Sequence, residues 1–167
     1  MRYMQIRKYD VANGPGIRST LFVAGCTLRC PSCFNKEYQD FKSGEPWTAD
    51  VEDAFLEHLK QPKIKGVTIL GGEPLDQIMD NQLHDLLKRI KEEAQKEIWI
   101  FSGHLYEELI QNTRQRAILD WCDVLVDGPF ILAQKDLKLK FRGSANQRLI
   151  DLNQTRETGM IQLLDLD

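Results

Sequence analysis

The chain has 167 residues, a length that fits one domain and excludes a complete eight-stranded β/α barrel, which takes about 250 residues. Hydrophobic residues make up 42% and charged residues 28% of the chain, which is a globular composition and excludes a disordered protein. The net charge of −3 provides no overall positive field for nucleic acid, and no apolar run approaches the roughly 20 residues of a membrane span. Residues 1–5 lack the apolar start of a signal peptide. We therefore expect a single soluble domain over residues 1–167, located in the cytoplasm.

Predicted strands and helices alternate along the chain. Short apolar runs bounded by glycine or proline predict buried strands, with two weaker candidates at the end: residues 17–24, 66–70, 98–101 and 123–126, then 147–152 and 161–164. Apolar residues at helical spacing predict three helices: residues 48–60, 75–94 and 105–119. Thr48 is the expected N-cap of the first helix, and residues 26–47 are expected to form a long loop.

This order predicts an α/β fold with a mostly parallel open sheet, because strand–helix–strand units place parallel strands side by side. In such sheets ligand chemistry gathers at the carboxyl ends of the strands. A cysteine, glycine or polar segment follows each of the four main strands: Cys26, residues 71–73, residues 102–104 and residues 127–129. We expect these four segments to converge on one site.

Three of the four cysteines lie close together, at Cys26, Cys30 and Cys33. Pro31 argues against a helix here, whereas a loop can wrap its thiolates around one compact metal centre. Thiolates favour zinc, copper(I) or iron–sulfur clusters, and an ordinary [4Fe–4S] cluster takes four cysteines. Three thiolates without an obvious fourth therefore suggest a cluster with one iron open to another ligand. The alternatives are a zinc site completed by Cys122, or a core cysteine beside a free C-x2-C pair; Cys122 itself fits a small buried residue.

The cysteine motif and the residues around it resemble the radical S-adenosylmethionine (SAM) enzymes. Phe34 and Asn35 follow the motif, and Gly-Gly-Glu-Pro follows later at residues 71–74. The segment N-G-P-G-I-R at residues 13–18 is similar to the D-G-P-G-I-R segment of activating proteins of glycyl radical enzymes. Asn13 stands where that family usually has Asp, and Phe34 stands where Tyr is common.

The C-terminal part of the chain resembles a narrower family, the proteins that activate anaerobic ribonucleoside-triphosphate reductase. The resemblance rests on V-D-G-P-F at residues 126–130 and F-R-G-S-A-N-Q-R at residues 141–148. Together with the cysteine motif, it covers about residues 13–150. The family implies an incomplete barrel of the radical SAM type. The order of the elements suggests roughly five or six strands, short of the eight that closure takes.

The resemblance also implies the cofactors and the reaction. Cys26, Cys30 and Cys33 would bind three irons of one [4Fe–4S] cluster, and SAM would chelate the fourth iron. One electron from a low-potential donor, such as a flavodoxin or ferredoxin, would cleave SAM to methionine and a 5′-deoxyadenosyl radical. That radical would take a hydrogen atom from a glycine of the partner, an anaerobic ribonucleoside-triphosphate reductase.

The cofactor-binding residues that we expect are Ser32, Cys33, Phe34, Gly71, Gly72, Glu73, Ser102, Asp127 and Arg142. By resemblance, residues 32–34 would contact the adenine and residues 71–73 the amino group of SAM, with Gly72 nearest. Arg142 would pair with a carboxylate, with Arg148 and Arg18 as further candidates, because Arg offers a planar fork of donors.

Most of these positions also have a simpler interpretation. Residues 71–73 could be a plain strand-to-helix turn, Phe34 a core aromatic residue and Ser102 a turn serine. Asp127 could hold a cation or SAM, or could only cap the following turn, and the arginines could form surface ion pairs.

Other functions stay open from the sequence. The partner could be another glycyl radical enzyme of the formate-lyase type, or the substrate could be a small molecule. The chain could also be an iron–sulfur or zinc module without catalysis. We expect no nucleic acid or membrane as a partner.

Overall fold

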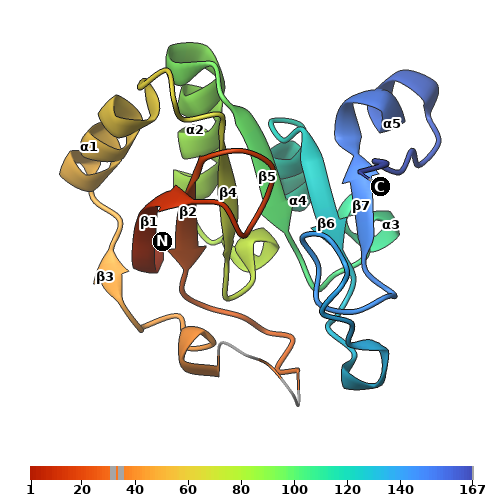
Figure 1. The fold of residues 1–167 in the computed structure, drawn as a ribbon. Coiled ribbons are helices and arrows are strands. Elements are labelled where there is room, and N and C mark those ends of the chain that lie inside the picture. The colour runs from red at the N-terminus through yellow and green to blue at the C-terminus, as the bar shows by residue number, and fades with distance from the viewer. Residues whose placement is uncertain (31–32, 34–35, 167) are drawn as a thin grey trace.

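The computed structural model describes residues 1–30, 33 and 36–166. In this part of the chain one open sheet contains seven strands in the order β3-β1-β2-β4-β5-β6-β7 (Figure 1). The strands are β1 Arg2–Asp10, β2 Arg18–Val23, β3 Glu45–Pro46, β4 Gly66–Gly71, β5 Glu97–Phe101, β6 Val124–Asp127 and β7 Arg148–Asp151. The helices are α1 Ala49–Leu59, α2 Gln82–Arg89, α3 Tyr106–Leu109, α4 Thr113–Leu119 and α5 Leu152–Thr158.

The centre of the sheet is parallel and its flanks are antiparallel. Strands β2, β4, β5 and β6 run side by side in parallel, whereas β1 pairs with β2 and β3, and β7 pairs with β6, in the antiparallel sense. The α/β class and the open sheet are confirmed. The strand count exceeds the prediction because β1 and β3 were missed. The first is rich in charged residues and is held by its ladder with β2 more than by burial.

The helices also differ from the sequence-based prediction. The helix predicted over residues 75–94 starts as a 3-10 turn at Pro74–Asp76, and α2 begins only at Gln82. The predicted helix over residues 105–119 is split, because the Asn112 side chain caps a new start at α4. Residues 161–164 form only an isolated bridge to β7. Helix α5 was missed because Asp151, at the end of a strand, caps it by accepting from Gln154 N–H at 3.0 Å.

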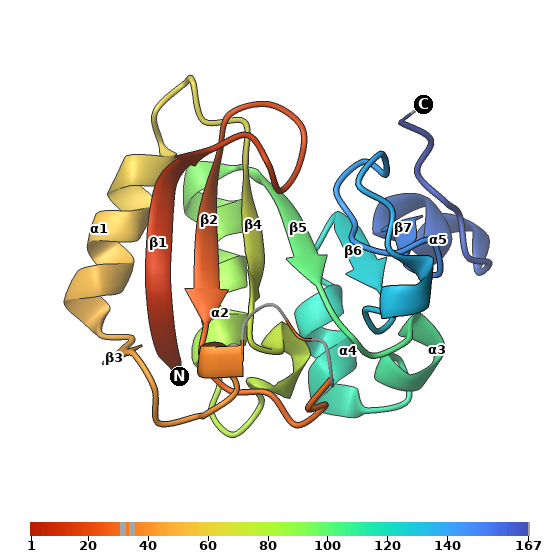
Figure 2. The same ribbon diagram turned by 60° about the horizontal axis from the view of Figure 1, so that its bottom comes forward.

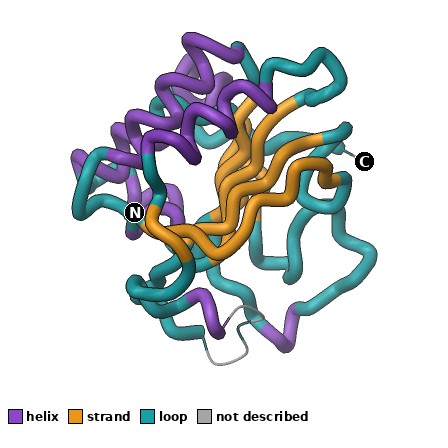
Figure 3. The backbone as a smooth tube through the Cα atoms, turned by 90° about the vertical axis from the view of Figure 1, so that its left-hand side faces the viewer, coloured by secondary structure: helices purple, strands orange, loops and turns teal. Residues whose placement is uncertain are grey.

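Side chains alternate between the two faces of the sheet, as the pleat requires. Ile98 and Ile100 of β5 point into the main core, which α1, α2 and α4 cover (Figure 3). Trp99 of β5 points to the other face and packs with Val126 and Leu149 in a second cluster. The helices in the described part of the chain are all too short or too polar to span a membrane.

Candidate iron–sulfur and cofactor site

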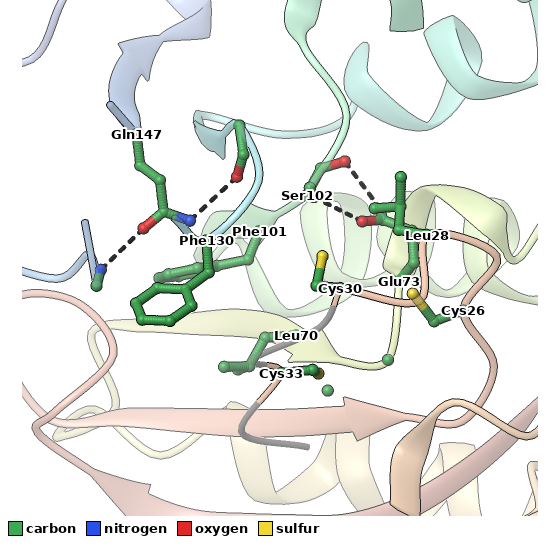
Figure 4. Close-up of a pocket in the computed structure, with 15 residues that line it drawn as sticks. Cys26, Leu28, Cys30, Cys33, Leu70, Glu73, Phe101, Ser102, Phe130 and Gln147 are labelled. Atoms are coloured by element: carbon green, nitrogen blue, oxygen red, sulfur yellow. Dashed lines mark hydrogen bonds between the residues drawn. The ribbon is translucent and has the colours of Figure 1, made fainter. Parts of the chain in front are cut away.

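A cavity of about 220 Å³ lies at the carboxyl ends of the parallel strands (Figure 4). The segments after β2, β4, β5 and β6 meet there, and the stretch just before β7 completes the wall. The lining residues are Cys26, Leu28, Cys30, Cys33, Leu70, Gly71, Gly72, Glu73, Phe101, Ser102, Gly103, Gly128, Phe130, Gly143 and Gln147. Elements far apart in the sequence thus form one site, as the strand order predicts.

The three clustered cysteines all line this cavity (Figure 4). The loop leaves β2 through Cys26, whose N–H donates to Gln39 O at 3.0 Å. Arg29 has a left-handed backbone with φ 53°, and the Cys33 N–H donates to Cys30 O at 3.2 Å. These turns bring Cys30 and Cys33 back toward the cavity. Ser32 and Phe34, which were predicted to contact SAM, lie outside the described residues.

Burial makes the charged thiolate forms of Cys26 and Cys30 less favourable when no metal is bound. Burial raises the pKa of the Cys26 thiol, and the N–H groups of Leu28 and Arg29, which donate to it, partly offset this. Burial also raises the pKa of Cys30. Metal ions displace thiol protons when they bind, and three thiols from one loop are the donor chemistry of an iron–sulfur cluster. The residues therefore fit such a cluster.

The fourth cysteine belongs to the core. Cys122 is fully buried and donates its thiol to Ile118 O. It precedes β6 at the amino-terminal end of the parallel strands, away from the cavity at their carboxyl ends. A zinc site completed by Cys122 does not match this position.

Two glycines after β4 allow the backbones to approach closely. Gly71 has φ +110°, and a Cβ there would lie 2.6 Å from Val23 N. A Cβ at Gly72 would lie 2.5 Å from Gly25 O. The N–H of Gly72 donates to Val23 O and the N–H of Glu73 to Gly25 O, both at 2.8 Å. The Gly-Gly-Glu segment is thus attached directly to the strand end that carries Cys26.

Glu73 connects the carboxyl ends of β4 and β5. Its Oε1 accepts from Gly103 N–H at 2.7 Å, and its Oε2 accepts from Leu75 N–H and the Ser102 hydroxyl, each at 2.9 Å. Burial raises the pKa of Glu73 to about 7. The Gly103 and Leu75 N–H groups and the nearby His104 act in the opposite direction, but their effect on the pKa is smaller. Ser102 also accepts from His104 N–H at 3.0 Å, so it organises this turn as well as lining the cavity.

A second acidic residue at this site, Asp76, was not predicted from the sequence. Its Oδ2 accepts from both the N–H and the hydroxyl of Thr27 at 2.8 Å, and its Oδ1 lies 2.9 Å from His104 Nε2. Burial acts to raise the pKa of Asp76, but the hydrogen bonds from His104 and Thr27 prevail and lower it. The hydrogen bond between Asp76 and His104 also raises the pKa of His104. Asp76 stands two residues beyond the recognised Gly-Gly-Glu-Pro motif, and only its proximity to that motif could have marked it.

The polar residues predicted from the C-terminal motifs lie in different places. Asp127 is completely buried and accepts from Arg148 Nε at 2.9 Å and from Tyr106 N–H at 2.8 Å. Arg148 also forms two 2.9 Å hydrogen bonds with Glu107. Arg142 is next to the cavity-lining Gly143, and among the described residues its buried Nε has no hydrogen-bond partner. Arg18 is buried at the amino-terminal end of β2, where it pairs with Glu97 at 3.0 Å.

Gln147 is a further residue that was not predicted. Its Oε1 accepts from Gly143 N–H at 2.8 Å, and its Nε2 donates to Gly128 O at 3.1 Å (Figure 4). It therefore joins the two ends of the segment between β6 and β7 at the cavity wall. The F-R-G-S-A-N-Q-R motif contained this residue, but spacing alone did not distinguish it from its neighbours.

A protein-family model described as "4Fe-4S single cluster domain" matches residues 12–150, a span that includes all of the residues that line the cavity. The match and the three cysteines at the cavity define the class, an iron–sulfur protein with one [4Fe–4S] cluster domain.

Named relatives narrow the class. The anaerobic ribonucleoside-triphosphate reductase-activating protein of Vibrio cholerae is 41% identical over 150 residues, which cover 88% of this chain and 96% of the relative. The protein of the same name from Escherichia coli K12 has the same identity and coverage. That of Enterobacteria phage T4 is 34% identical over 152 residues, covering 89% and 93%. The chain therefore belongs to the family of anaerobic ribonucleoside-triphosphate reductase-activating proteins.

Proposed function

We propose that this protein activates an anaerobic ribonucleoside-triphosphate reductase by generating a glycyl radical on it. The observation that carries the proposal is that Cys26, Cys30 and Cys33 line the same cavity as residues 71–73. The names of the relatives supply the partner, and a low-potential flavodoxin or ferredoxin would supply the electron. We place the reaction in the cytoplasm.

The three cysteines would each bind one iron of a [4Fe–4S] cluster, with SAM on the fourth iron. Once bound, the cluster and SAM would supply one-electron cleavage of the sulfonium to methionine and a 5′-deoxyadenosyl radical. The protein would contribute position and shielding, as in other cofactor enzymes. Leu28, Leu70 and Phe101 give the cavity an apolar wall, which would limit the access of water to the reacting atoms.

The Gly-Gly-Glu segment would hold the amino group of SAM. The N–H bonds of this amino group are hydrogen-bond donors, so their partner in the protein must be an acceptor. The N–H groups of Gly72 and Glu73 already donate to Val23 O and Gly25 O. The amino group of SAM would therefore donate to backbone carbonyl oxygens of this segment. Glu73 would fix this segment against Ser102, which also lines the cavity.

The other residues predicted to contact SAM differ in how available their side chains are. Arg142, next to Gly143, would pair with the SAM carboxylate after a change of rotamer, because its Nε is buried without a partner in the described structure. Asp127 would contact SAM only by releasing Arg148 or Tyr106. We propose Ser32 and Phe34 as adenine contacts by resemblance alone.

The open sheet fits a protein substrate. We propose that it is the incomplete barrel of a radical SAM enzyme, whose open side would admit a glycine loop of the reductase. A small-molecule radical enzyme would need that side closed to protect its intermediate.

The test is anaerobic reconstitution followed by three measurements. The protein should bind about 4 Fe and 4 S, as one [4Fe–4S] cluster requires. With a reductant it should release 5′-deoxyadenosine from SAM, and with the reductase it should produce a glycyl radical signal in electron paramagnetic resonance (EPR). Zinc without a cluster, or a cluster that leaves SAM intact, would overturn the proposal. A formate-lyase-type enzyme as the only activated partner would overturn the choice of partner.

A further inference from the structure

The segment between β6 and β7, residues 128–147, is here called the strap. Its two ends line the cavity through Gly128, Phe130, Gly143 and Gln147. Its 3-10 turn, Leu132–Gln134, lies at the same end of the sheet as the cysteine loop, and the chain then turns back along the sheet toward Trp99 of β5 (Figures 1 and 2). A protein that presents a residue to this cavity must therefore pass beside the strap.

The base of the strap is firmly held. Gln147 bonds to both ends of it, and the Phe141 ring packs edge-on against Trp99 of β5 with centroids 5.5 Å apart. Ile131 N–H donates to the Ser144 hydroxyl at 3.2 Å, which joins the two sides of the strap. These contacts keep its position at the cavity fixed.

Two leucines in the middle of the strap, in contrast, are exposed to solvent. Leu132 is 59% and Leu137 is 89% exposed, although leucine is usually buried. Single exposed leucines are common on protein surfaces, but here two of them belong to one short segment whose ends line the proposed active site. Such a placement is typical of a contact surface.

The charge of the strap is opposite to that of the whole chain. It contains Lys135, Lys138, Lys140 and Arg142 against the single acid Asp136, a net charge of +3, whereas the chain carries −3. Complementary charge steers protein association and fixes its orientation. The partner surface that fits the strap is therefore acidic, with an apolar centre for the leucines.

The strap also contains unsatisfied polar atoms. Among the described residues, two buried side-chain atoms have no hydrogen-bond partner, Arg142 Nε and Asn146 Oδ1, and both lie in the strap. Buried polar atoms usually have partners, and a missing one costs free energy. Arg142 is the proposed partner of the SAM carboxylate, so Asn146 Oδ1 is the atom of the strap that a small rearrangement on docking would leave free to accept a hydrogen bond.

We propose that the strap is the docking surface for the protein that carries the substrate glycine, through an acidic segment with apolar side chains beside that glycine. This inference rests on the proposed function and specifies its partner site. The glycine-bearing protein is favoured over the electron donor because the glycine must enter the cavity that the strap lines. An electron donor needs only to approach the cluster from any side.

The test uses the full-length protein with its reconstituted cluster, the radical-free reductase, and dithionite as a chemical reductant. The variant is Leu137→Asp with Lys138→Glu, two exposed residues outside the cavity lining. The matched control is Met160→Asp with Lys88→Glu, which likewise replaces one exposed apolar residue by Asp and one exposed Lys by Glu in other parts of the surface.

We expect the strap variant to release 5′-deoxyadenosine from SAM at the wild-type rate when the reductase is absent. Its Kd for the reductase should rise about tenfold or more, as for two interface contacts, and the glycyl radical should form more slowly at low reductase concentration. Wild-type affinity should fall with added salt more steeply than that of the variant. The control pair should match the wild type throughout.

Each other outcome overturns the inference. Equal affinity and radical yield would exclude the strap as the docking surface. Loss of SAM cleavage without the reductase would assign the strap to cofactor binding. A defect seen with a flavodoxin but not with dithionite would assign it to the electron donor. A wild-type protein that forms no glycyl radical would instead refute the proposed function, and this result is separate from all of the others.

Discussion

Asp76 holds Thr27, the residue directly after Cys26, by accepting two hydrogen bonds of 2.8 Å from its N–H and its hydroxyl. The other oxygen of Asp76 is held by His104, from the segment after β5. The start of the cysteine loop is therefore attached to the ends of two neighbouring strands. We expect this attachment to position Cys26 before any cluster is present.

The first prediction concerns Asp76→Asn. The change removes the charge and one acceptor, and hydrogen bonds to charged groups contribute about 1.5–3 kcal/mol. The free energy of unfolding of the apoprotein should fall by about 2 kcal/mol in urea denaturation. The reconstituted protein should lose iron faster on gel filtration than the wild type. In an NMR titration the pKa of His104 should be lower than in the wild type, because its Asp76 partner raises it.

Asp50→Asn is the control for this change, since Asp50 is exposed in the first turn of α1. It should keep the iron and leave the pKa of His104 unchanged. If Asp76→Asn behaves in the same way, the attachment of Thr27 does not support the cysteine loop.

The second prediction separates the cysteines by role. Cys26→Ala, Cys30→Ala and Cys33→Ala should each abolish the [4Fe–4S] absorbance and 5′-deoxyadenosine release, because each removes one iron ligand. Cys122→Ala should keep both and lower the free energy of unfolding by about 1 kcal/mol, comparable with removal of one buried methylene. Activity in any of the first three variants would show that the ligand assignment is wrong.

The parallel centre of the fold could be predicted because its strands are apolar runs that end in glycine or polar residues. The first strand could not, because β1 carries Arg2, Arg7 and Lys8 and depends on its backbone ladder with β2. The C-terminal helix α5 could not either. Its N-cap, Asp151, is the last residue of a strand, so the strand pattern obscured the start of the helix.

The site could be predicted where residues are close in sequence or where strand ends converge. Cys26, Gly72 and Ser102 meet in the cavity for that reason. The partners of buried charges could not be predicted, because they depend on which side chains meet in space. Asp127 pairs with Arg148 across the antiparallel β6–β7 ladder, and nothing in the spacing of these two residues specifies that pair.

The third prediction tests the close approach at Gly72. In Gly72→Ala the new Cβ would lie 2.5 Å from Gly25 O and 2.7 Å from Tyr38 O, both backbone atoms that cannot move aside cheaply. We expect a loss of several kcal/mol, beyond the roughly 1–3 kcal/mol typical of overpacking, together with loss of SAM binding. Gly159→Ala meets open space and should cost only the backbone strain of its φ of +75°, about 1–2 kcal/mol. Similar costs for both variants in urea denaturation would contradict this account.

The fourth prediction concerns the buried pair of Asp127 and Arg148. Arg148→Ala leaves a fully buried carboxylate without its main partner, which typically costs 3–5 kcal/mol. We expect a loss of about 3 kcal/mol by chemical denaturation, and a smaller loss for Arg148→Lys, which keeps the charge without the planar fork. Lys88→Ala, an exposed residue of α2, should change stability by less than about 0.5 kcal/mol. Equal effects of Arg148→Ala and Lys88→Ala would show that Asp127 does not need Arg148.

The carboxyl group of Glu73 provides the last prediction, a pH dependence of folding. Burial raises the pKa of Glu73 from 4.5 to about 7. Between these two pH values the unfolded chain loses the proton while the folded protein keeps it. Fewer protons are then bound in the unfolded state, so the contribution of Glu73 to stability is complete below pH 4.5 and decreases as the pH rises to about 7.

Glu73→Gln removes this titration, although it also disturbs the hydrogen bonds to Gly103 and Leu75 and should lower stability at every pH. The measured quantity is therefore the difference in unfolding free energy between wild type and variant. From pH 4.5 to about 7 the wild type should lose roughly 3 kcal/mol relative to Glu73→Gln, at about 1.36 kcal/mol for each pKa unit. Glu157→Gln, an exposed residue of α5, should show a constant difference. If the Glu73→Gln difference is also constant over this range, the pKa of Glu73 is not raised in the folded protein, and its three hydrogen-bond donors offset its burial.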